Sequence, residues 1–308
     1  MTKVLVIGSY NVGLTVFGKE IPKIHETIMG DHFDMGPGGK GSNQAIALAR
    51  LGADVTFLAQ IGDDIFGKAA MDLFNKEGID TSYIKTDSST HTGAGIIFVN
   101  KDKHNCIAVA PGANYNLSAE TIDAADELFK KCDYLLIQLE TPIPTVYYAI
   151  EKAKLNNMKV ILNPAPAQKL DDKHLAMVDI ITPNETEAQV ITDIAVIDTQ
   201  SAFKAAQVLM DKGVKTVIIT LGDHGCVLVN DKCKKHFDAY KVKPVDTTGA
   251  GDAFNGGLTC ALAEGKTIEQ AIDFASKVGA ISVTSIGCVP GLPTKDDVNN
   301  FVGIKEGD

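Results

Sequence analysis

The segment best suited to chemistry is a run of three small residues followed by a carboxylate, Gly-Ala-Gly-Asp at positions 249–252. Apolar residues at helical spacing follow it, so we predict that a loop ends and a helix begins here. The first N–H groups of a helix lack internal partners, and glycine lets a phosphate approach the main chain, so the junction predicts an anion site. Asp252 would repel that anion unless it takes a proton from the group that attacks the phosphate. The segment therefore predicts phosphoryl transfer with a general base.

A second glycine-rich segment, residues 38–45, could also bring a ligand close to the main chain. Its Lys40 and Asn43 can donate hydrogen bonds to hydroxyl oxygens, although Asn43 could instead be a helix cap or a turn residue. The segment is not a Walker A loop, because Asp34 stands where that motif requires glycine. The glycines that follow the first strand lack the G-x-G-x-x-G spacing, which disfavours a dehydrogenase.

Buried strands and amphipathic helices alternate along most of the chain. This pattern predicts an α/β fold with a doubly wound, mostly parallel sheet flanked by helices. Apolar runs at 4–7, 55–61 and 134–138 predict strands, and 40–51 and 199–212 predict helices. In such sheets ligands lie at the carboxyl ends of the strands. The polar residues that follow an apolar run, and are therefore expected at that edge, are Asn11, Glu140, Asn184, Thr220 and Asp252.

Two segments, about 13–37 and 91–112, have a different pattern, in which apolar and polar residues alternate between turns. Such alternation is typical of antiparallel strands exposed on one face. We expect a small sheet apart from the main core, inserted into a single domain that spans residues 1–308. An ordinary surface hairpin is the alternative for each segment.

The amino-acid composition limits the kinds of molecule that this protein is expected to bind and the compartment in which it is expected to occur. With 29 Lys plus Arg against 39 Asp plus Glu, the net charge of -10 argues against nucleic acid or an anionic membrane as the main partner. The six cysteines form no C-x-x-C pair, so we expect free thiols in a reducing compartment. The N-terminus shows no secretory leader, and no apolar run approaches the ~18 residues of a membrane span. We therefore expect a cytoplasmic protein.

Two motifs carry a resemblance to a known family. Residues 246–254 match the pattern D-T-x-G-A-G-D-x-F, and residues 38–53 match a sugar-site motif, which together resemble the ribokinase family of carbohydrate kinases. The resemblance implies ATP-dependent phosphorylation of a primary sugar hydroxyl, with D-ribose giving D-ribose 5-phosphate as the favoured reaction. It also implies that the two alternating segments form a lid over the sugar and the interface of a homodimer.

The resemblance assigns roles to individual residues. The catalytic group comprises the base Asp252 and the main-chain N–H groups of Gly249, Ala250 and Gly251. The sugar would contact Asn11, Gly13, Gly39, Lys40, Asn43, Glu140 and Asp252. ATP would contact Asn184, Thr220, Gly222, Gly225, Gly251 and Ser276. Mg²⁺ would be organised by Glu187, and K⁺ would be bound near Asp246, Thr248, Ser282, Ser285, Gly287 and Gly291.

Ordinary structural roles remain open for several of these residues. Asn184 and Glu187 have the spacing of a helix capping box, which is compatible with a binding role. Glu140 could be a surface carboxylate, Asn11 a turn residue, and the segment 282–291 a plain turn.

One position departs from the family pattern. The family commonly has Asn-x-Asp where this chain has Asn11-Val12-Gly13, and that aspartate accepts bonds from two sugar hydroxyls. Its loss would cost about 2 to 4 kcal/mol if the hydroxyls stayed unpaired. The acceptor could therefore be another sugar, such as deoxyribose or a ketose, or a nucleoside. A sugar-binding regulator without catalysis is the alternative from another class, but the intact Asp252 argues against it.

Overall fold

The computed structural model describes residues 2–102 and 104–305, which form one large sheet, one small sheet and surrounding helices. The large sheet has nine strands within the described residues, in the spatial order β13 (Cys233–Phe237), β12 (Cys226–Asn230), β11 (Thr216–Thr220), β10 (Ile180–Ile181), β9 (Lys159–Leu162), β8 (Tyr134–Ile137), β1 (Lys3–Ile7), β4 (Asp54–Gly62) and β5 (Ile84–Asp87). All pairs from β11 to β5 are parallel, and β12 and β13 add an antiparallel edge.

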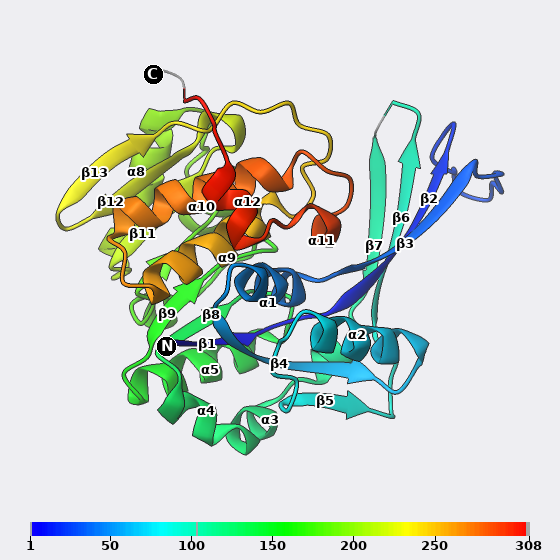
Figure 1. The fold of residues 1–308 in the computed structure, drawn as a ribbon, viewed down its shortest axis with the longest axis horizontal. Helices are drawn as coiled ribbons and strands as arrows, with labels where there is room; N and C mark the ends of the chain where they lie inside the picture. Colours follow the sequence, from blue (N-terminus) through cyan, green and yellow to red (C-terminus); the bar gives the residue numbers. More distant parts are fainter. Residues whose placement is uncertain (1, 103, 306–308) are drawn as a thin grey trace.

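Helices cover both faces of this sheet (Figure 1). The first face carries α1 (Lys40–Arg50), α2 (Ile65–Lys76), α9 (Ala250–Ala263), α10 (Ile268–Ser282), α11 (Cys288–Gly291) and α12 (Lys295–Asn300). The second carries α3 (Ala119–Ala124), α4 (Asp126–Lys131), α5 (Ile143–Leu155), α6 (Asp172–Leu175), α7 (Glu185–Thr192) and α8 (Thr199–Asp211). The predicted fold class is confirmed.

The strand β1 shows why the central strands read as continuous apolar runs. Val4 and Val6 belong to the core on the α1 side, whereas Leu5 and Ile7 belong to the core on the α5 side, and all four are fully buried. A strand covered on both faces has no position for a polar side chain until it ends. The first polar residues therefore occur at the carboxyl edge of the sheet, where the candidate site lies.

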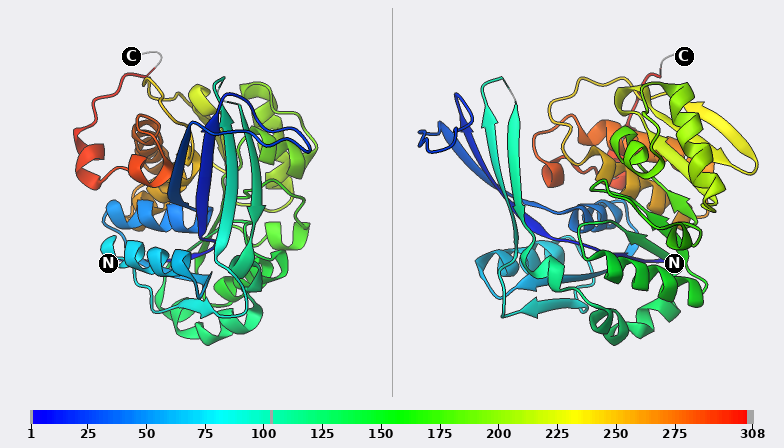
Figure 2. Two further views of the ribbon diagram at one scale, coloured as in Figure 1. Left: turned by 90° about the vertical axis from the view of Figure 1, so that its right-hand side faces the viewer. Right: turned by 180° about the vertical axis from the view of Figure 1, so that it is seen from behind.

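The small sheet consists of β3 (His32–Gly38), β2 (Asn11–Gly18), β6 (Gly93–Asn100) and β7 (Asn105–Ala110), in that order. It projects from one side of the body, and Figure 2 shows it both face-on and in profile. The outer pairs are antiparallel, but β2 and β6 are parallel, so the expected antiparallel arrangement is wrong for the central pair. The reason is that the first strand of each hairpin runs outward from the body, and the sheet places these two outward strands side by side.

No helix in the described part of the chain is long and apolar enough to cross a membrane.

Candidate active site

The centre of the candidate site is the start of α9. Gly249 caps the helix in a left-handed conformation (φ 80°), and the helix begins at Ala250, so Asp252 lies in its first turn and not ahead of it as predicted. The Ala250 N–H donates to the Thr247 carbonyl oxygen at 3.2 Å. The N–H groups of the first helical turn have no partner within the helix, so Gly251 can offer its N–H to a phosphate.

The start of α1 brings two amide side chains to Asp252. Asn43 donates from Nδ2 to Asp252 Oδ2 at 2.8 Å, and Gln44 donates from Nε2 to Asp252 Oδ1 at 2.9 Å. The cap of α1 is Gly39, so the alternative that Asn43 is a helix cap is wrong. A Cβ on Gly41 would lie 2.5 Å from the Ser9 nitrogen, which shows how closely α1 approaches the end of β1. Both carboxylate oxygens of Asp252 are thus held by buried amides.

Three carboxylates surround one ammonium group in this site. Burial alone lowers the pKa of Lys40, but the carboxylates of Asp252, Glu140 and Glu187 outweigh it and the pKa is raised. Burial raises the pKa of Asp252, against the opposing effects of Lys40 and the two amide hydrogen bonds. Burial likewise raises the pKa of Glu187. The site therefore combines three carboxyl groups with one ammonium group, and burial disfavours the ionised form of two of the carboxyls.

Glu140 follows the carboxyl end of β8, whereas Asn11, which was expected at the end of the first strand, is the first residue of β2. Glu140 Oε2 accepts from the Ser9 hydroxyl at 2.5 Å and from the Lys40 N–H at 2.8 Å, which leaves Oε1 for another donor. Asn11 Oδ1 accepts from Asn114 Nδ2 at 2.9 Å, so the amide NH₂ of Asn11 remains for a ligand. Glu140 is therefore a positioned carboxylate and not a freely solvated one.

The capping box predicted at the start of α7 is confirmed. Asn184 Oδ1 accepts from the Glu187 N–H at 2.8 Å, and Glu187 Oε2 accepts from the Asn184 N–H at 2.9 Å. Asn184 also pairs with Thr220 in an isolated bridge, which brings the start of α7 to the end of β11. Glu187 is buried, although a capping carboxylate is normally solvated. The capping box explains the hydrogen bonds of Glu187. The charges of Lys40 and Asp252 act on the Glu187 carboxyl, so this residue lies at the candidate site.

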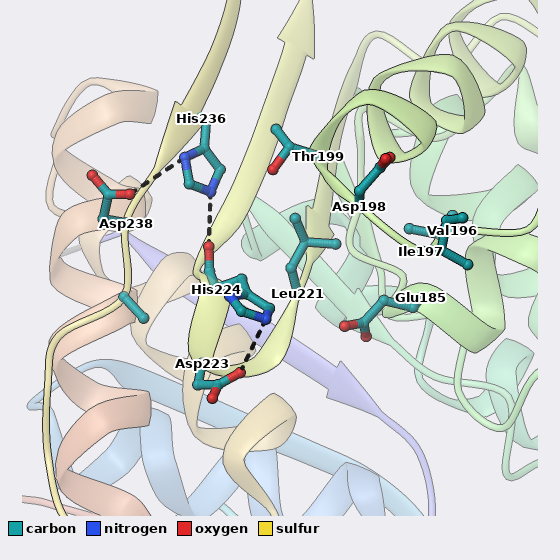
Figure 3. Close-up of a pocket in the computed structure, with 11 residues that line it drawn as sticks. Glu185, Val196, Ile197, Asp198, Thr199, Leu221, Asp223, His224, His236 and Asp238 are labelled. Atoms are coloured by element: carbon teal, nitrogen blue, oxygen red, sulfur yellow. Dashed lines mark hydrogen bonds and ion pairs between the residues drawn. The ribbon is translucent and has the colours of Figure 1, made fainter. Parts of the chain in front are cut away.

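The segment after β11 forms the glycine turn that was predicted for the nucleotide. Gly222 and Gly225 both have positive φ, and Leu221 N–H donates to the Gly225 carbonyl oxygen at 2.8 Å. Beside this turn lies a pocket of about 310 Å³ (Figure 3). Its lining comprises Glu185, Val196, Ile197, Asp198, Thr199, Leu221, Asp223, His224, His236, Asp238 and Ala239.

His236 stabilises this turn from the neighbouring strand. Its Nε2 lies 2.7 Å from the His224 carbonyl oxygen, which can only accept, so Nε2 carries the proton. The pocket contains neither Asp252 nor Lys40, so it lies apart from the predicted catalytic group.

The two segments predicted to bind K⁺ lie against each other. Asp246 accepts from the Thr248 N–H and from the Gly287 N–H, each at 2.9 Å. These two bonds and burial act in opposite directions on the Asp246 carboxyl, and its pKa is lowered. A Cβ on Gly291 would lie 2.5 Å from the Ser282 carbonyl oxygen.

Two further predicted residues lie at the margin of this region. Ser285 is exposed in the same loop as Gly287, and Ser276 lies half-buried on α10. Among the described residues, the side chains that donate to Asp252 are those of Asn43 and Gln44 and neither of these serines.

Several polar residues of the site were not predicted. Gln44 donates to Asn163 Oδ1 at 3.0 Å and accepts from Gln138 Nε2 at 2.6 Å, which forms a buried row of amides behind Asp252. Gln138 follows β8 and Asn163 follows β9, so the rule that selected Glu140 and Asn184 would also have selected them.

Cys288 was also not predicted as part of the site. Its Sγ lies 2.0 Å from where a Cβ on Gly249 would be. It lies within the segment 282–291, which was expected to bind K⁺ together with Asp246 and Thr248, but Cys288 itself had no predicted role.

Comparisons with known proteins identify the family of this chain. The model of the pfkB family of carbohydrate kinases matches residues 1–295. A ribokinase of Haemophilus influenzae is 46% identical over 96% of this chain and 97% of its own length. A deoxyribokinase of Salmonella typhimurium is 38% identical over 98% of this chain and 99% of its own.

Solved structures extend the likeness to three dimensions. The structure of Arabidopsis thaliana ribokinase complexed with ribose and ATP has a TM-score of 0.92 and 27% identity, and the match covers 98% of this chain and 99% of that one. Fold, site geometry and family model lead to one conclusion: the chain belongs to the pfkB family of carbohydrate kinases.

Proposed function

We propose that this chain transfers the γ-phosphoryl group of ATP to the primary hydroxyl of a sugar, with D-ribose as the first candidate acceptor. The observation that carries the proposal is Asp252, a buried carboxylate in the first turn of α9 whose oxygens are both held by amides. The relatives named ribokinase, and the Arabidopsis structure with ribose and ATP, favour ribose and ATP as the substrates.

In this proposal Asp252 accepts the proton of the attacking hydroxyl. Its raised pKa makes it a stronger base than an exposed aspartate, while Lys40 and the amides favour the ionised form that a base requires. The main chain of Gly249, Ala250 and Gly251 would face the transferring phosphoryl group at the positive end of the helix dipole. Glu140 Oε1 would accept from a sugar hydroxyl and so orient the acceptor.

The nucleotide would lie along the turn after β11. Asn184, Thr220, Gly222 and Gly225 are placed together by the bridge and the turn, and Ser276 is the candidate contact on α10. The same chain would form a single kinase domain over residues 1–308, with segments 13–37 and 91–112 as its lid.

The site has few protein ligands for a metal ion, so we expect the ATP phosphates to hold most of the bound Mg²⁺. No group of three or more His, Cys, Asp or Glu in the described residues could hold a metal ion. Glu187 already accepts two hydrogen bonds from Asn184. We therefore expect it to bind a water ligand of Mg²⁺ and not the ion itself, because Mg²⁺ usually keeps several of its waters. Bound Mg²⁺ supplies positive charge to the ATP phosphates. A bound K⁺ would use carbonyl oxygens of the adjoining segments that contain Asp246, Thr248, Ser282, Ser285, Gly287 and Gly291.

Three glycines on adjacent strands of the small sheet favour a phosphoryl acceptor other than ribose. Gly13 is paired directly with Gly36 on β3 and with Gly95 on β6. A Cβ on Gly13 would meet nothing closer than 3.6 Å, and one on Gly36 nothing within 4 Å, so packing does not require glycine at either position. The lid therefore offers open space where the family's aspartate would stand. This space favours an acceptor that lacks the hydroxyls bound by that aspartate, such as a deoxysugar, or a bulkier one, such as a nucleoside.

The test is ADP release over a panel of D-ribose, 2-deoxyribose, ketoses and nucleosides, with Mg²⁺ and with K⁺ present or absent. If ribose is the acceptor, Gly13→Asp is expected to raise kcat/KM for ribose by about tenfold or more, because it restores a charged acceptor. If another compound leads in the wild type, the same change is expected to lower kcat/KM for that compound. Turnover of no compound would support the regulator.

We also propose a homodimer through the outer face of the lid. Phe33, Met35 and Ile96 are exposed, and the strand register places them on the face opposite Gly13. Met35→Glu is expected to shift the protein to monomer in analytical ultracentrifugation, because it would bury a charge in the interface. Ile107→Glu is the control: its exposure is similar, 54% against 55% for Met35, but it lies on the other face. Equal effects of the two variants would contradict this interface.

A further inference from the structure

Gln44 lies behind Asp252, and the bonds of its amide fix its orientation. It is fully buried in α1, its Nε2 lies 2.9 Å from Asp252 Oδ1 and 3.0 Å from Asn163 Oδ1, and its Oε1 lies 2.6 Å from Gln138 Nε2. An amide nitrogen has two N–H groups, and both are used here. A reversed amide would place Oε1 against two acceptor oxygens.

The orientation of the Gln44 amide is fixed by a backbone carbonyl oxygen, which can only accept a hydrogen bond. Asn163 Nδ2 donates to the Thr182 carbonyl oxygen at 3.3 Å, so Asn163 Oδ1 must face Gln44. That oxygen in turn requires an N–H from Gln44, and the second N–H then faces Asp252. The row follows the sheet, because Gln138, Asn163 and Thr182 each follow one of three adjacent strands, β8, β9 and β10.

The same row also holds the main chain of α9. Thr182 donates from Oγ1 to Asn255 Oδ1 at 2.6 Å, and Asn255 donates from Nδ2 to the Gly251 carbonyl oxygen at 2.8 Å. The side chain of Asp252 and the carbonyl group that precedes it are therefore connected to one set of buried bonds. Such a set restricts both the rotation of the carboxylate and the position of the helix start.

We propose that Gln44 is a positioning residue for the phosphoryl transfer: it fixes the rotation of the Asp252 carboxylate and stabilises its ionised form. This inference rests on the proposed role of Asp252 as the base. Other groups near Asp252 also act on its charge: Lys40 and the Asn43 amide favour ionisation, Glu140 opposes it, and Glu187 and the half-buried Cys288 are close enough for Asp252 to raise the pKa of each. Gln44 differs from Lys40 because its bond is directional.

The test is the pH profile of kcat for Gln44→Met, which keeps the length of the side chain but removes both N–H groups. Without the bond, the pKa of Asp252 is expected to rise further, so the acidic limb of the profile moves to higher pH by about one to two units. On the acidic limb kcat is expected to fall about tenfold to a hundredfold at a given pH, and to recover as the pH is raised. The KM for the sugar should change little, because Gln44 does not face the acceptor.

A matched control lies in the same protein. Gln60 is also buried and donates to a carboxylate, Asp87 Oδ2 at 2.7 Å, at the end of β4. Gln60→Met is expected to lower the thermal unfolding temperature without moving the acidic limb. If Gln44→Met lowers kcat equally at every pH, Gln44 does not stabilise the ionised form of Asp252 and the proposal is overturned.

A second variant covers the case in which Gln44→Met fails to fold. Gln44→Glu keeps the shape and places a second carboxyl beside Asp252, so it is expected to move the acidic limb in the same direction and further. An unmoved limb in that variant would also overturn the proposal. Failure of the base itself is distinguishable, because Asp252→Asn would then retain turnover whatever the result at Gln44.

Discussion

Replacing Asp252 with asparagine is expected to lower turnover by about 10² to 10⁴, the range typical of a lost general base. Asparagine keeps the shape, but it cannot take the proton, and its NH₂ group would face the amide of Asn43 or Gln44. The measurement is coupled ADP release at saturating sugar and ATP. If this variant turns over at nearly the wild-type rate, Asp252 is not the base.

The stability of the same variant is expected to be maintained. The folded-state pKa of Asp252 is raised by burial, so its ionised form costs stability as the pH rises through that pKa. Asparagine removes this cost at neutral pH, although it also weakens the Asp252 hydrogen bonds, so the thermal unfolding temperature should not fall sharply.

A control variant distinguishes the loss of the catalytic base from the general effect of removing a buried carboxylate. Asp179 is also buried, and its oxygens accept from Lys154 at 2.6 Å and Lys215 at 2.7 Å, outside the site. Asp179→Asn is expected to lower stability, because two lysines lose a charged partner, while kcat is retained. A comparable loss of kcat in both variants would show that the effect at Asp252 is structural.

Gly249→Ala is expected to lower kcat by about 10² to 10³, because it displaces the helix start that would stabilise the phosphoryl group. The substitution destabilises the folded state in two ways. Gly249 has φ 80°, where a side chain costs about 1 to 2 kcal/mol. Its Cβ would also lie 2.0 Å from Cys288 Sγ, so the Cys288 side chain or one of the helices α9 and α11 must shift. Coupled ADP release and thermal unfolding measure the two consequences.

The two costs can be separated. Gly265 has nearly the same conformation, φ 81°, but a Cβ there meets nothing within 4 Å, so Gly265→Ala carries the backbone cost alone. Adding Cys288→Ala to Gly249→Ala removes the contact with sulfur and is expected to restore part of the stability. If Gly249→Ala is no worse than Gly265→Ala, the contact with Cys288 does not constrain the site.

Local patterns account for what could be predicted. The helices α1 and α8 and the capping box of Asn184 and Glu187 depend on residues within a few positions of one another, so their signals are complete in the sequence. The alternation of buried strands and helices likewise predicted the fold class. It also predicted that residues after the ends of parallel strands share one edge, and Glu140, which accepts from Ser9 and Lys40, lies there.

The sequence by itself thus determined the elements, the family and the residue types of the site. Only the tertiary structure decided which residues meet. Asn43 and Gln44 reach Asp252 across about two hundred residues because α1 packs against α9, and the order of β8, β9 and β10 aligns Gln138, Asn163 and Thr182 in one row. The tertiary structure also decided the close approach of Gly249 to Cys288 and the parallel central pair of the small sheet. A periodic pattern records which face of an element is buried, but the partner of that face depends on the order of strands and the packing of helices.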